Sequence, residues 1–569
     1  MNLKVVITVF LASCFFKAHA QSNVFENFKN ISAIAKPDAE KWKQLQGNFG
    51  FSIVNVNTRA TYNTYPIIDK QTAIQLNAWA GEEVNAQVVI SSKVDAGKIN
   101  VTTGGLVSAN GNKINNAIQI GYIYYVIADN SVGICYKQGK KYPDIIVPDI
   151  IDFNSSESFV KSYTNRPVWI KIKVPEDAQP GDYKSKVTAS VNGVSKTLNI
   201  NLKVSANKLP ALKDRKFFLE LWQYPVTEAD YYKVKPWSDE HLKLMKPAMT
   251  QLKDAGEDVI TASFFWDMFN TTARDVDDMF IKIRKKVSGD YTYDFTNFDK
   301  WVNYMTSIGI SRQITMFGMA TLNYRMYYYD EAKGGVTYIQ QGVKNEQYKQ
   351  FWTPYLKAFG AHLKEKGWFD KTTIGFSEKE LDISVPLIRF IKSIDPQWKI
   401  SYSGKYFPEI QDAVYDYSII SNQHIPADII AGREKKGYVT TFYTSCWERV
   451  PNTFVMSDPI DATWLAWNAS NRNLDGYLRY AFDFWTPSIL TNVITNVASG
   501  DNFLFYPYGY SSVRFEMLKD GIEDFEKVRI KKNQSSTQIK SVLDQFELKK
   551  VNLVPSRFRQ IQEARTSLE

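Results

Sequence analysis

Three carboxylates in the second half of the chain stand where they could carry out acid–base chemistry. Glu378, preceded by Ser377, follows an apolar run that ends at Phe376, and Glu448 and Asp483 come after two further runs. A carboxyl group with apolar neighbours can have its pKa raised until it acts as a general acid near neutral pH. We therefore predict that Glu378 is the acid, with Glu448 and Asp483 as candidates for a second carboxylate. A structural salt bridge at a strand end is the competing interpretation of Glu378.

Two carboxyl groups that flank a bond are the arrangement that cleaves glycosides. One group protonates the leaving oxygen, and the other stabilises or attacks the anomeric carbon; in retaining enzymes the two lie about 5 Å apart. Aromatic residues are also abundant, with 14 Trp, 33 Tyr and 34 Phe. Because aromatic rings stack on the C–H faces of sugars, this composition favours a carbohydrate ligand.

Other residues near the same predicted strand ends are candidates for contacts with a substrate. They are Trp447, Trp485, Tyr402, His424 and Tyr480; Arg514, further along the chain, is a candidate as well. Single tryptophans are also common in protein cores, and Arg514 could equally tie the last helix to its domain. His424 has no His or Cys at ligand spacing, because only His241 and His362 remain beyond the first 20 residues. We therefore predict neither a metal nor another cofactor.

These residues are positioned by a pattern of alternating strands and helices that begins after Leu209-Pro210. The first helix is predicted to start at Ser238, a residue type that caps helices. The predicted strands are 217–221, 258–264, 312–317, 372–376, 399–403, 417–421, 439–443 and 477–482. Eight such units fit a closed TIM-like (β/α)8 barrel better than a doubly wound sheet, the alternative. In a parallel barrel the candidate residues meet at the C-terminal edge of the strands.

Residues 50–207 have the pattern of an all-β domain. Short β-branched runs such as 86–90, 118–123 and 187–191 lie between Gly, Asn and Asp turns. Ile170, Ile172 and Val174 alternate with polar residues and are predicted to share one buried face. A β-sandwich is therefore expected, followed by the barrel with its C-terminal helices over 208–569.

The first 20 residues are predicted to be a signal peptide, followed by a leader segment over 21–49. A basic start, an apolar run over 5–16 and the small residues of Ala18-His19-Ala20 are typical of export and cleavage. The run is too short to span a bilayer, and no later segment reaches that length. Residues 11–14 also resemble a lipobox, in which Cys14 would be lipidated. The chain is thus expected in the periplasm or at the cell surface.

Charge and cysteine content narrow the possible partners. The net charge of +9 is spread over the chain without a clustered basic face, so no nucleic-acid partner is predicted. Cys135 and Cys446 are the two cysteines besides Cys14 and lie far apart in sequence. We therefore expect packing, not a disulfide framework, to stabilise the fold. A glycan is the predicted partner, and no oligomeric state is predicted.

Several motifs in fixed order resemble glycoside hydrolase family 123, whose members are exported β-N-acetylgalactosaminidases with a β-sandwich and a barrel. In the sandwich they are 81–82, 86–89, 168–170, 174–175 and 180–183. The most specific ones lie near the end of the chain, at 443–446, 475–478, 500–501, 506–507, 512–516 and 520–526. The resemblance covers nearly the whole chain after the signal peptide.

The resemblance implies a substrate-assisted mechanism. In the family the sugar's 2-acetamido oxygen attacks the anomeric carbon, an Asp stabilises that amide, and the next residue, a Glu, is the acid and then the base. Here Ser377, Glu378 and Lys379 match that Asp, the Glu and a following Pro, so the Glu is present and the Asp is not. Losing one such electrostatic group costs about 3 kcal/mol, or about 10²–10³ in rate. Tyr480 and Asp483 also stand where the family tends to have Trp and Asn.

Two functions are consistent with these departures. The first is an exo-acting glycosidase that uses Glu378 as its acid/base, with altered specificity. The second is a glycan-binding protein on the same scaffold that has lost catalysis.

Overall fold

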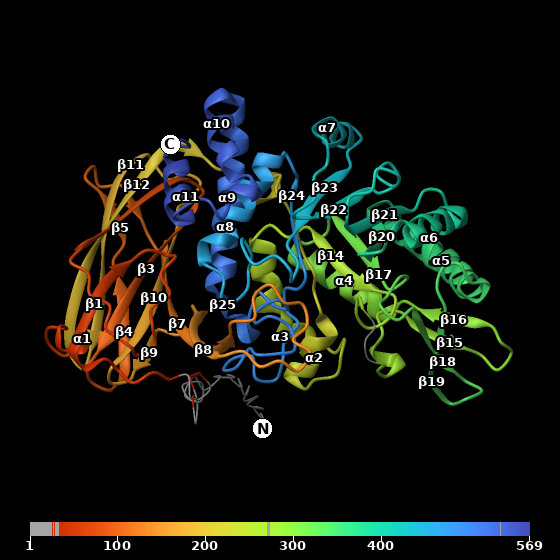
Figure 1. Cartoon of the computed structure of the whole chain (residues 1–569), viewed down its shortest axis with the longest axis horizontal. Coiled ribbons are helices and arrows are strands. Elements are labelled where there is room, and N and C mark those ends of the chain that lie inside the picture. Colours follow the sequence, from red (N-terminus) through yellow and green to blue (C-terminus); the bar gives the residue numbers. More distant parts are fainter. Residues whose placement is uncertain (1–24, 27, 29–33, 270–272, 535) are drawn as a thin grey trace, which may run out of the picture.

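The computed structural model describes residues 25–26, 28, 34–269, 273–534 and 536–569. The predicted signal peptide and Cys14 lie outside these residues. Figure 1 shows a β-rich domain at one end of the molecule, a domain of alternating strands and helices at the other, and the C-terminal helices between them. This confirms the predicted fold class.

The N-terminal domain is a sandwich of two mainly antiparallel sheets. The first has the order β1-β3-β10-β7-β8-β25 and the second β2-β12-β11-β4-β9, with β5 and β6 beside it. Ile170 and Ile172 are fully buried and Val174 is nearly so, as their alternation predicts. The strands are β1 Phe49–Val54, β2 Ala73–Ala80, β3 Glu83–Ser92, β4 Ala96–Thr103, β5 Leu106–Ser108, β6 Lys113–Ile114, β7 Ile118–Asp129, β8 Asp144–Asp152, β9 Glu157–Val160, β10 Thr164–Lys173, β11 Gly181–Val191, β12 Val194–Lys208 and β25 Ser511–Ser512.

Part of the predicted leader packs on this sandwich. Helix α1 (Ala39–Lys43) buries Trp42, whose indole N–H donates to the backbone oxygen of Asn63 at 2.9 Å. Glu26 forms an ion pair with the buried Arg166, with N–O distances of 2.6 and 2.8 Å. These contacts join the leader to the sandwich core.

The second domain is a nearly closed barrel of eight parallel strands in the order β13-β24-β23-β22-β21-β20-β17-β14. All eight predicted strands are present, with ends that differ by up to three residues. They are β13 Phe218–Leu221, β14 Val259–Ser263, β17 Gln313–Phe317, β20 Thr372–Ser377, β21 Lys399–Gly404, β22 Asp416–Ile420, β23 Val439–Tyr443 and β24 Gly476–Arg479.

The helices around the barrel are less regular than the (β/α)8 pattern predicts, because the described connection between β21 and β22 contains no helix. Helix α3 does begin after Ser238, whose hydroxyl accepts from the backbone N–H of His241 at 3.2 Å. The helices are α2 Pro225–Tyr232, α3 Asp239–Asp254, α4 Thr296–Ile308, α5 Glu346–Lys366, α6 Leu381–Ile394, α7 Ala427–Lys435, α8 Pro459–Arg472, α9 Val513–Gln534, α10 Ser536–Leu543 and α11 Arg557–Thr566.

Side chains complete the barrel between its first two strands. Strand β13 is joined to the chain just before β14 by an isolated bridge between Leu219 and Glu257. The Glu257 carboxylate accepts from the backbone N–H groups of Leu221 at 2.8 Å and Val259 at 3.0 Å. Gln223 accepts from Thr261 N–H at 2.8 Å. These bonds satisfy strand groups that a direct ladder would otherwise pair.

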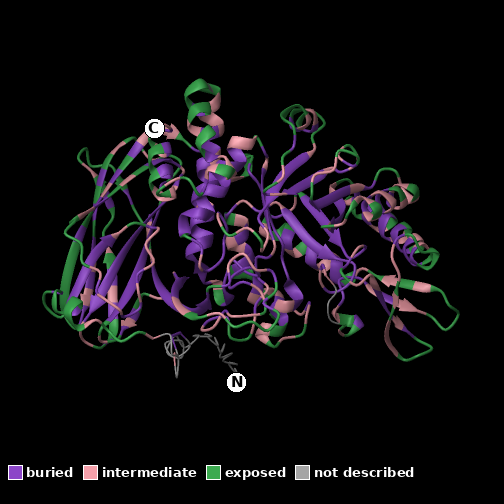
Figure 2. Ribbon diagram, viewed as in Figure 1, coloured by how far each residue is buried: buried purple, intermediate pink, exposed green. Residues whose placement is uncertain are grey.

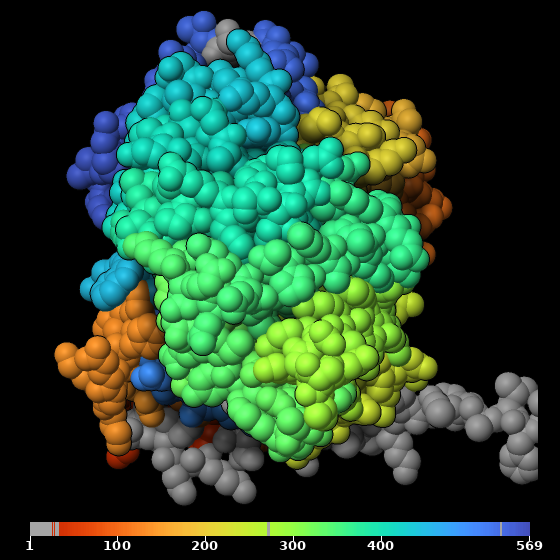
Figure 3. All heavy atoms as spheres, turned by 90° about the vertical axis from the view of Figure 1, so that its right-hand side faces the viewer, coloured from red at the N-terminus to blue at the C-terminus, as the bar shows by residue number. Residues whose placement is uncertain are grey.

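The connections around β17 carry an additional small sheet. Its four strands have the order β16-β15-β18-β19 and are β15 Lys282–Lys285, β16 Tyr291–Asp294, β18 Arg325–Asp330 and β19 Gly335–Gln340. In Figure 1 this sheet projects at the lower right, and in Figure 3 the green and yellow-green part of the chain covers that face. This small sheet is not among the elements predicted from the sequence.

Helices α8 and α9 are the most buried helices between the two domains (Figure 2). The chain just before α9 adds strand β25 to the first sandwich sheet by pairing Ser511 with Ile151 and Ser512 with Ile150. Lys171 of β10 pairs with Glu516 of α9 at 2.8 Å. The two domains therefore share one polar and well-packed interface. Among the described residues, no helix is both long and apolar enough to cross a membrane.

Candidate active site

Glu378 lies directly after β20, at the C-terminal edge of the barrel. Its side chain is exposed, whereas Phe376 two residues earlier is buried. Glu378 has a φ of 51°, a left-handed conformation that is uncommon for residues other than glycine. Its backbone N–H still donates to Ser403 O on β21 at 2.7 Å. The end of the strand is therefore fixed while the carboxyl group faces solvent.

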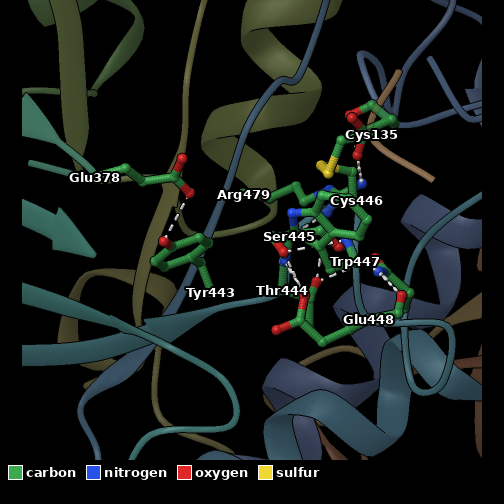
Figure 4. Close-up of a disulfide and its surroundings, with 11 residues drawn as sticks. Cys135, Glu378, Tyr443, Thr444, Ser445, Cys446, Trp447, Glu448 and Arg479 are labelled. Atoms are coloured by element: carbon green, nitrogen blue, oxygen red, sulfur yellow. Dashed lines mark hydrogen bonds and ion pairs between the residues drawn. A yellow bond between two sulfur atoms is a disulfide. The ribbon is translucent and has the colours of Figure 1, made fainter. Parts of the chain in front are cut away.

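Tyr443, the last residue of β23, holds the Glu378 carboxyl group. Its hydroxyl donates to Glu378 Oε1 at 3.0 Å (Figure 4). Burial and the nearby Glu378 carboxylate raise the pKa of Tyr443 well above its ordinary value. The phenol therefore stays protonated and acts as the donor in this bond. Tyr443 belongs to the motif at 443–446 but is not among the predicted site residues.

Tyr443 belongs to a hydrophobic cluster separate from the main core. Its buried members include Trp222, Phe317 and Leu478, and Phe269 and Tyr480 pack against them. The Trp222 and Phe317 rings are 4.7 Å apart between centroids. Trp222, Phe317 and Tyr480 each end or directly follow a barrel strand, so the cluster forms an aromatic layer at the C-terminal edge. Trp222 and Phe317 could have been recognised in the sequence as bulky aromatics at predicted strand ends.

Glu448 does not hydrogen-bond to Glu378, because its own carboxylate serves to shape a loop. Oε1 accepts from the Ser421 hydroxyl at 2.9 Å, and Oε2 accepts from Ser445 N–H at 2.8 Å and from its hydroxyl at 2.5 Å. Both oxygens thus have partners within the protein. Trp447, the residue before it, is 69% exposed and free to stack on a ligand.

Asp483 and Trp485 do not occupy the positions that the sequence analysis predicts for them. Asp483 has no exposed surface, and its Oδ1 accepts from Tyr224 N–H at 2.7 Å. Trp485 is 4% exposed, and its indole N–H donates to the backbone oxygen of Phe505 at 2.8 Å. Both predictions require a side chain open to substrate and are wrong for this structure. The two residues stabilise the segment after β24 instead.

The remaining candidates from the barrel differ in their access to solvent. Tyr402 is buried beside Glu378, and its hydroxyl donates to Lys379 O at 2.9 Å. Burial, first, and the adjacent charges raise the pKa of Tyr402 above its ordinary range. Ser377 and Tyr480 are half-buried, and His424 is exposed. Tyr402 therefore supports the end of β20, whereas the other three remain accessible.

Arg514 is a structural residue, which corrects its prediction as a substrate contact. It is 1% exposed, and its guanidinium pairs with Asp149 of the sandwich, with an Nη2–Oδ2 distance of 3.0 Å. Its Nη1 donates to Thr453 O at 2.7 Å and to Phe503 O at 2.9 Å. The alternative role, as a tie for the last barrel helix, is close to what is observed. Arg514, however, joins this helix to the sandwich domain and not only to the barrel.

Cys135 and Cys446 form a disulfide with a Cα–Cα distance of 4.8 Å. Sequence spacing excludes a disulfide framework but does not predict this single bond, which forms because the domain interface brings together two cysteines that are 311 residues apart. The bond links the β7–β8 connection of the sandwich to the loop after β23 (Figure 4). It lies next to the loop that carries Trp447 and Glu448.

A buried ion pair lies beside the loop that carries Trp447 and Glu448. Arg479 pairs with Asp501 at 2.7 Å and donates to Thr444 O at 2.7 Å. Burial raises the pKa of Asp501, and Glu378 and Glu448 act in the same direction, while Arg479 opposes them. Three carboxylates and one guanidinium thus share this side of the barrel edge. No group of three or more His, Cys, Asp or Glu side chains suited to a metal ion occurs in the described part of the chain.

One cavity lies away from these residues. About 1100 Å³ opens between the sandwich and the C-terminal helices, lined in part by Glu82, Asn85, Asp520, Lys527 and Arg565. None of the candidate residues above lines it. We give greater weight to the barrel edge, because it combines an exposed carboxyl group with aromatic side chains.

Family models match both domains of the chain. The model described as glycoside hydrolase 123, catalytic domain, matches residues 222–531, and that of the glycoside hydrolase 123 N-terminal domain matches residues 53–191. The first match alone covers more than half of the chain. The chain belongs to glycoside hydrolase family 123. The resemblance noted in the motifs is thereby confirmed at the level of the family.

A solved structure of the same family is similar over almost its full length. It is a family 123 glycoside hydrolase from Clostridium perfringens, whose description concerns glycolipid glycan hydrolysis. The TM-score is 0.81 at 25% identity, and the match covers 91% of this chain and 97% of that one.

More distant solved structures have little in common with this family 123 chain. A Parabacteroides merdae β-glucuronidase (9% identity; 84% of this chain and 52% of that one) and a termite-gut GH10 xylanase (9%; 80% and 100%) each have a TM-score of 0.31. At that score the likeness has no bearing on activity. No curated protein matches the sequence.

Proposed function

We propose that this family 123 protein is an exo-acting glycosidase of extracellular or periplasmic glycans that uses Glu378 as its general acid/base. The observation that carries the proposal is the pairing of an exposed carboxyl group with the buried hydroxyl of Tyr443, at 3.0 Å. A carboxyl group held by one oxygen keeps the other available to protonate the leaving oxygen of a glycoside. It can then accept a proton from the attacking water.

The residue at position 377, a serine, affects which sugar can be the substrate and how the anomeric carbon is attacked. An amino sugar brings its own nucleophile, the 2-acetamido oxygen, and this matters because both oxygens of Glu448 are occupied by Ser421 and Ser445. The Ser377 hydroxyl could accept from the acetamido N–H, but it carries no charge to offset the cationic intermediate. We therefore propose an amino-sugar substrate, with a rate or specificity that differs from that of enzymes with an Asp at this position.

The proposed location is outside the cytoplasm. The first 20 residues have the pattern of an export signal, with a lipidated Cys14 as the alternative. The Cys135–Cys446 disulfide supports export, since such bonds persist in oxidising compartments.

The second candidate function is glycan binding without hydrolysis, and Ser377 is the observation that favours it. A variant of the acid separates the two. We expect Glu378→Gln to lower the turnover of an aryl N-acetyl-β-galactosaminide by about 10²–10⁴, the usual contribution of a general acid, without lowering the melting temperature. A wild type that binds glycans but turns over no member of a broad aryl-glycoside panel would instead support the binding protein. Full activity in Glu378→Gln would refute the assignment of the acid.

A further inference from the structure

Each cysteine of the disulfide is directly followed in the sequence by an exposed aromatic residue. Tyr136 is 61% exposed and Trp447 is 69% exposed, although most large aromatic residues of the described chain are buried. Tyr136 follows Cys135 in the sandwich domain, and Trp447 follows Cys446 in the barrel domain. Since the Cα atoms of the two cysteines are 4.8 Å apart, the backbone positions of Tyr136 and Trp447 lie close together.

The backbone that carries Tyr136 is held on both sides. The next residue, Lys137, is buried, and its ammonium group pairs with Asp129 at 2.6 Å and donates to Thr495 O at 2.7 Å. Its backbone N–H donates to Asn496 O at 2.9 Å. The sandwich loop is therefore fixed to the segment after β24 as well as to Cys446.

The loop that carries Trp447 is equally well fixed. The backbone N–H of Trp447 donates to the Ser445 hydroxyl at 3.2 Å. The side-chain amide of Asn452 donates to Ser445 O at 2.9 Å and to Glu448 O at 2.6 Å. A rigid loop loses little conformational freedom when its aromatic ring binds a ligand. Both rings are thus exposed on backbone that is already ordered.

The two aromatic residues stand next to the candidate active site. The Tyr136 hydroxyl is close enough to Tyr480, in the aromatic layer at the barrel edge, to contribute to the raised pKa of that residue after burial and Asp501. Glu448, adjacent to Trp447, likewise adds to the field at Tyr443, the partner of Glu378. In Figure 4 the disulfide and Trp447 lie on one side of Arg479, with Glu378 and Tyr443 on the other.

We infer that Tyr136 and Trp447 form a binding subsite for the sugar ring on the leaving-group side of the scissile bond. This inference rests on the proposed function. Tyr136 and Trp447 are far more exposed than the aromatic layer around Tyr443, which includes Trp222 and Phe317. They form an outer layer on loops that the disulfide joins across the two domains. A glycan that continues beyond the bond cleaved at Glu378 would extend into this outer layer. Its ring would offer C–H faces to the exposed aromatic side chains.

The test compares two probes that differ only on the leaving-group side. One is methyl N-acetyl-β-galactosaminide, and the other is a disaccharide of N-acetylgalactosamine β-linked to galactose. We expect Trp447→Ala and Tyr136→Ala each to lower kcat/KM for the disaccharide by about tenfold, the size of one aromatic contact. The kcat/KM of both variants for the methyl glycoside should equal that of the wild type. Trp447→Phe should keep most of the disaccharide activity, and Tyr163→Ala, at an exposed tyrosine beside α1, is the matched control.

Equal losses on both probes, or no loss on either, would overturn the subsite. Should the wild type hydrolyse neither probe, the proposed function fails, and calorimetry with the disaccharide then decides on the subsite. Binding by the wild type that Trp447→Ala weakens about tenfold would support it, because tenfold is the size expected for one contact. Binding that Trp447→Ala leaves unchanged, or no binding by the wild type, would contradict it.

Discussion

The hydroxyl of Tyr443 donates a 3.0 Å hydrogen bond to Oε1 of Glu378, although the two residues are 65 positions apart. Tyr443 ends β23 and Glu378 directly follows β20, and these two strands are separated in the barrel by β22 and β21. A tyrosine from one side of the barrel edge thus orients a carboxyl group on another. The arrangement requires the sheet to curve, because a flat sheet would hold these two strands three strand spacings apart.

Removing this donor should impair catalysis without loss of stability. We expect Tyr443→Phe to lower kcat on an aryl N-acetyl-β-galactosaminide by about tenfold or more, because one hydrogen bond to a charged group contributes about 1.5–3 kcal/mol. Tyr406→Phe removes a hydroxyl that bonds to Gln411 at 2.6 Å, away from Glu378, and should have no effect. Steady-state kinetics and thermal melts check both variants. Unchanged kinetics in Tyr443→Phe would argue against a catalytic contact.

Restoring a carboxylate at position 377 should increase the rate. If Ser377 stands where the family has its amide-stabilising Asp, Ser377→Asp should raise kcat for an N-acetyl-β-galactosaminide by about 10²–10³. Ser377→Ala is the control and should leave kcat within a few fold of the wild type. A Ser377→Asp variant that folds normally but is no faster would show that Ser377 does not replace that Asp.

The buried carboxyl pair of Glu228 and Asp483 should make stability depend on pH. Both have no exposed surface; burial raises the pKa of Asp483 from 3.8 to about 6 and that of Glu228 well above 4.5. The folded state holds protons on these two groups that the unfolded chain releases near pH 4. The contribution of the pair to the stability of the folded state is therefore complete below about pH 4 and is lost as the pH rises through 6.

Glu228→Gln should remove much of this dependence. We expect its melting temperature to exceed that of the wild type by about 2 °C or more at pH 8, with a smaller difference at pH 5. Thermal melts at the two pH values measure it. Glu365→Gln, at an exposed position of α5, is the control and should leave the pH profile unchanged. The same offset at both pH values would mean that the pair is not protonated in the folded state.

Arg514 should stabilise the contact between the domains without taking part in catalysis. Arg514→Ala leaves the buried Asp149 with Tyr506, which hydrogen-bonds to it at 2.7 Å, and with a longer ion pair to Arg59 at 4.0 Å. Breaking a buried ion pair in this way costs about 3–5 kcal/mol. Urea unfolding should show that loss, while Lys436→Ala, which breaks the exposed pair with Asp412, should change little. A loss of activity in the folded variant without loss of stability would return Arg514 to the substrate site.

Much of the architecture could be predicted from local sequence, for identifiable reasons. The eight barrel strands are short apolar runs between turn signals, and parallel strands buried on both faces have this pattern. Ser238 marked the start of α3 because its hydroxyl replaces a missing helical partner. Glu378 could be placed at the barrel edge because a residue that directly follows a parallel strand lies there in any such barrel.

Other features were decided by the tertiary structure alone. Whether Asp483, Trp485 and Arg514 face substrate or the interior depends on how the segments after β24 fold back, and no local pattern contains that information. The Tyr443–Glu378 bond and the Cys135–Cys446 disulfide join residues 65 and 311 positions apart. The sequence by itself determined which residues end the strands. Only the closing of the barrel and the docking of the sandwich decided which of these ends meet, because contacts between distant segments depend on the packing of the whole chain.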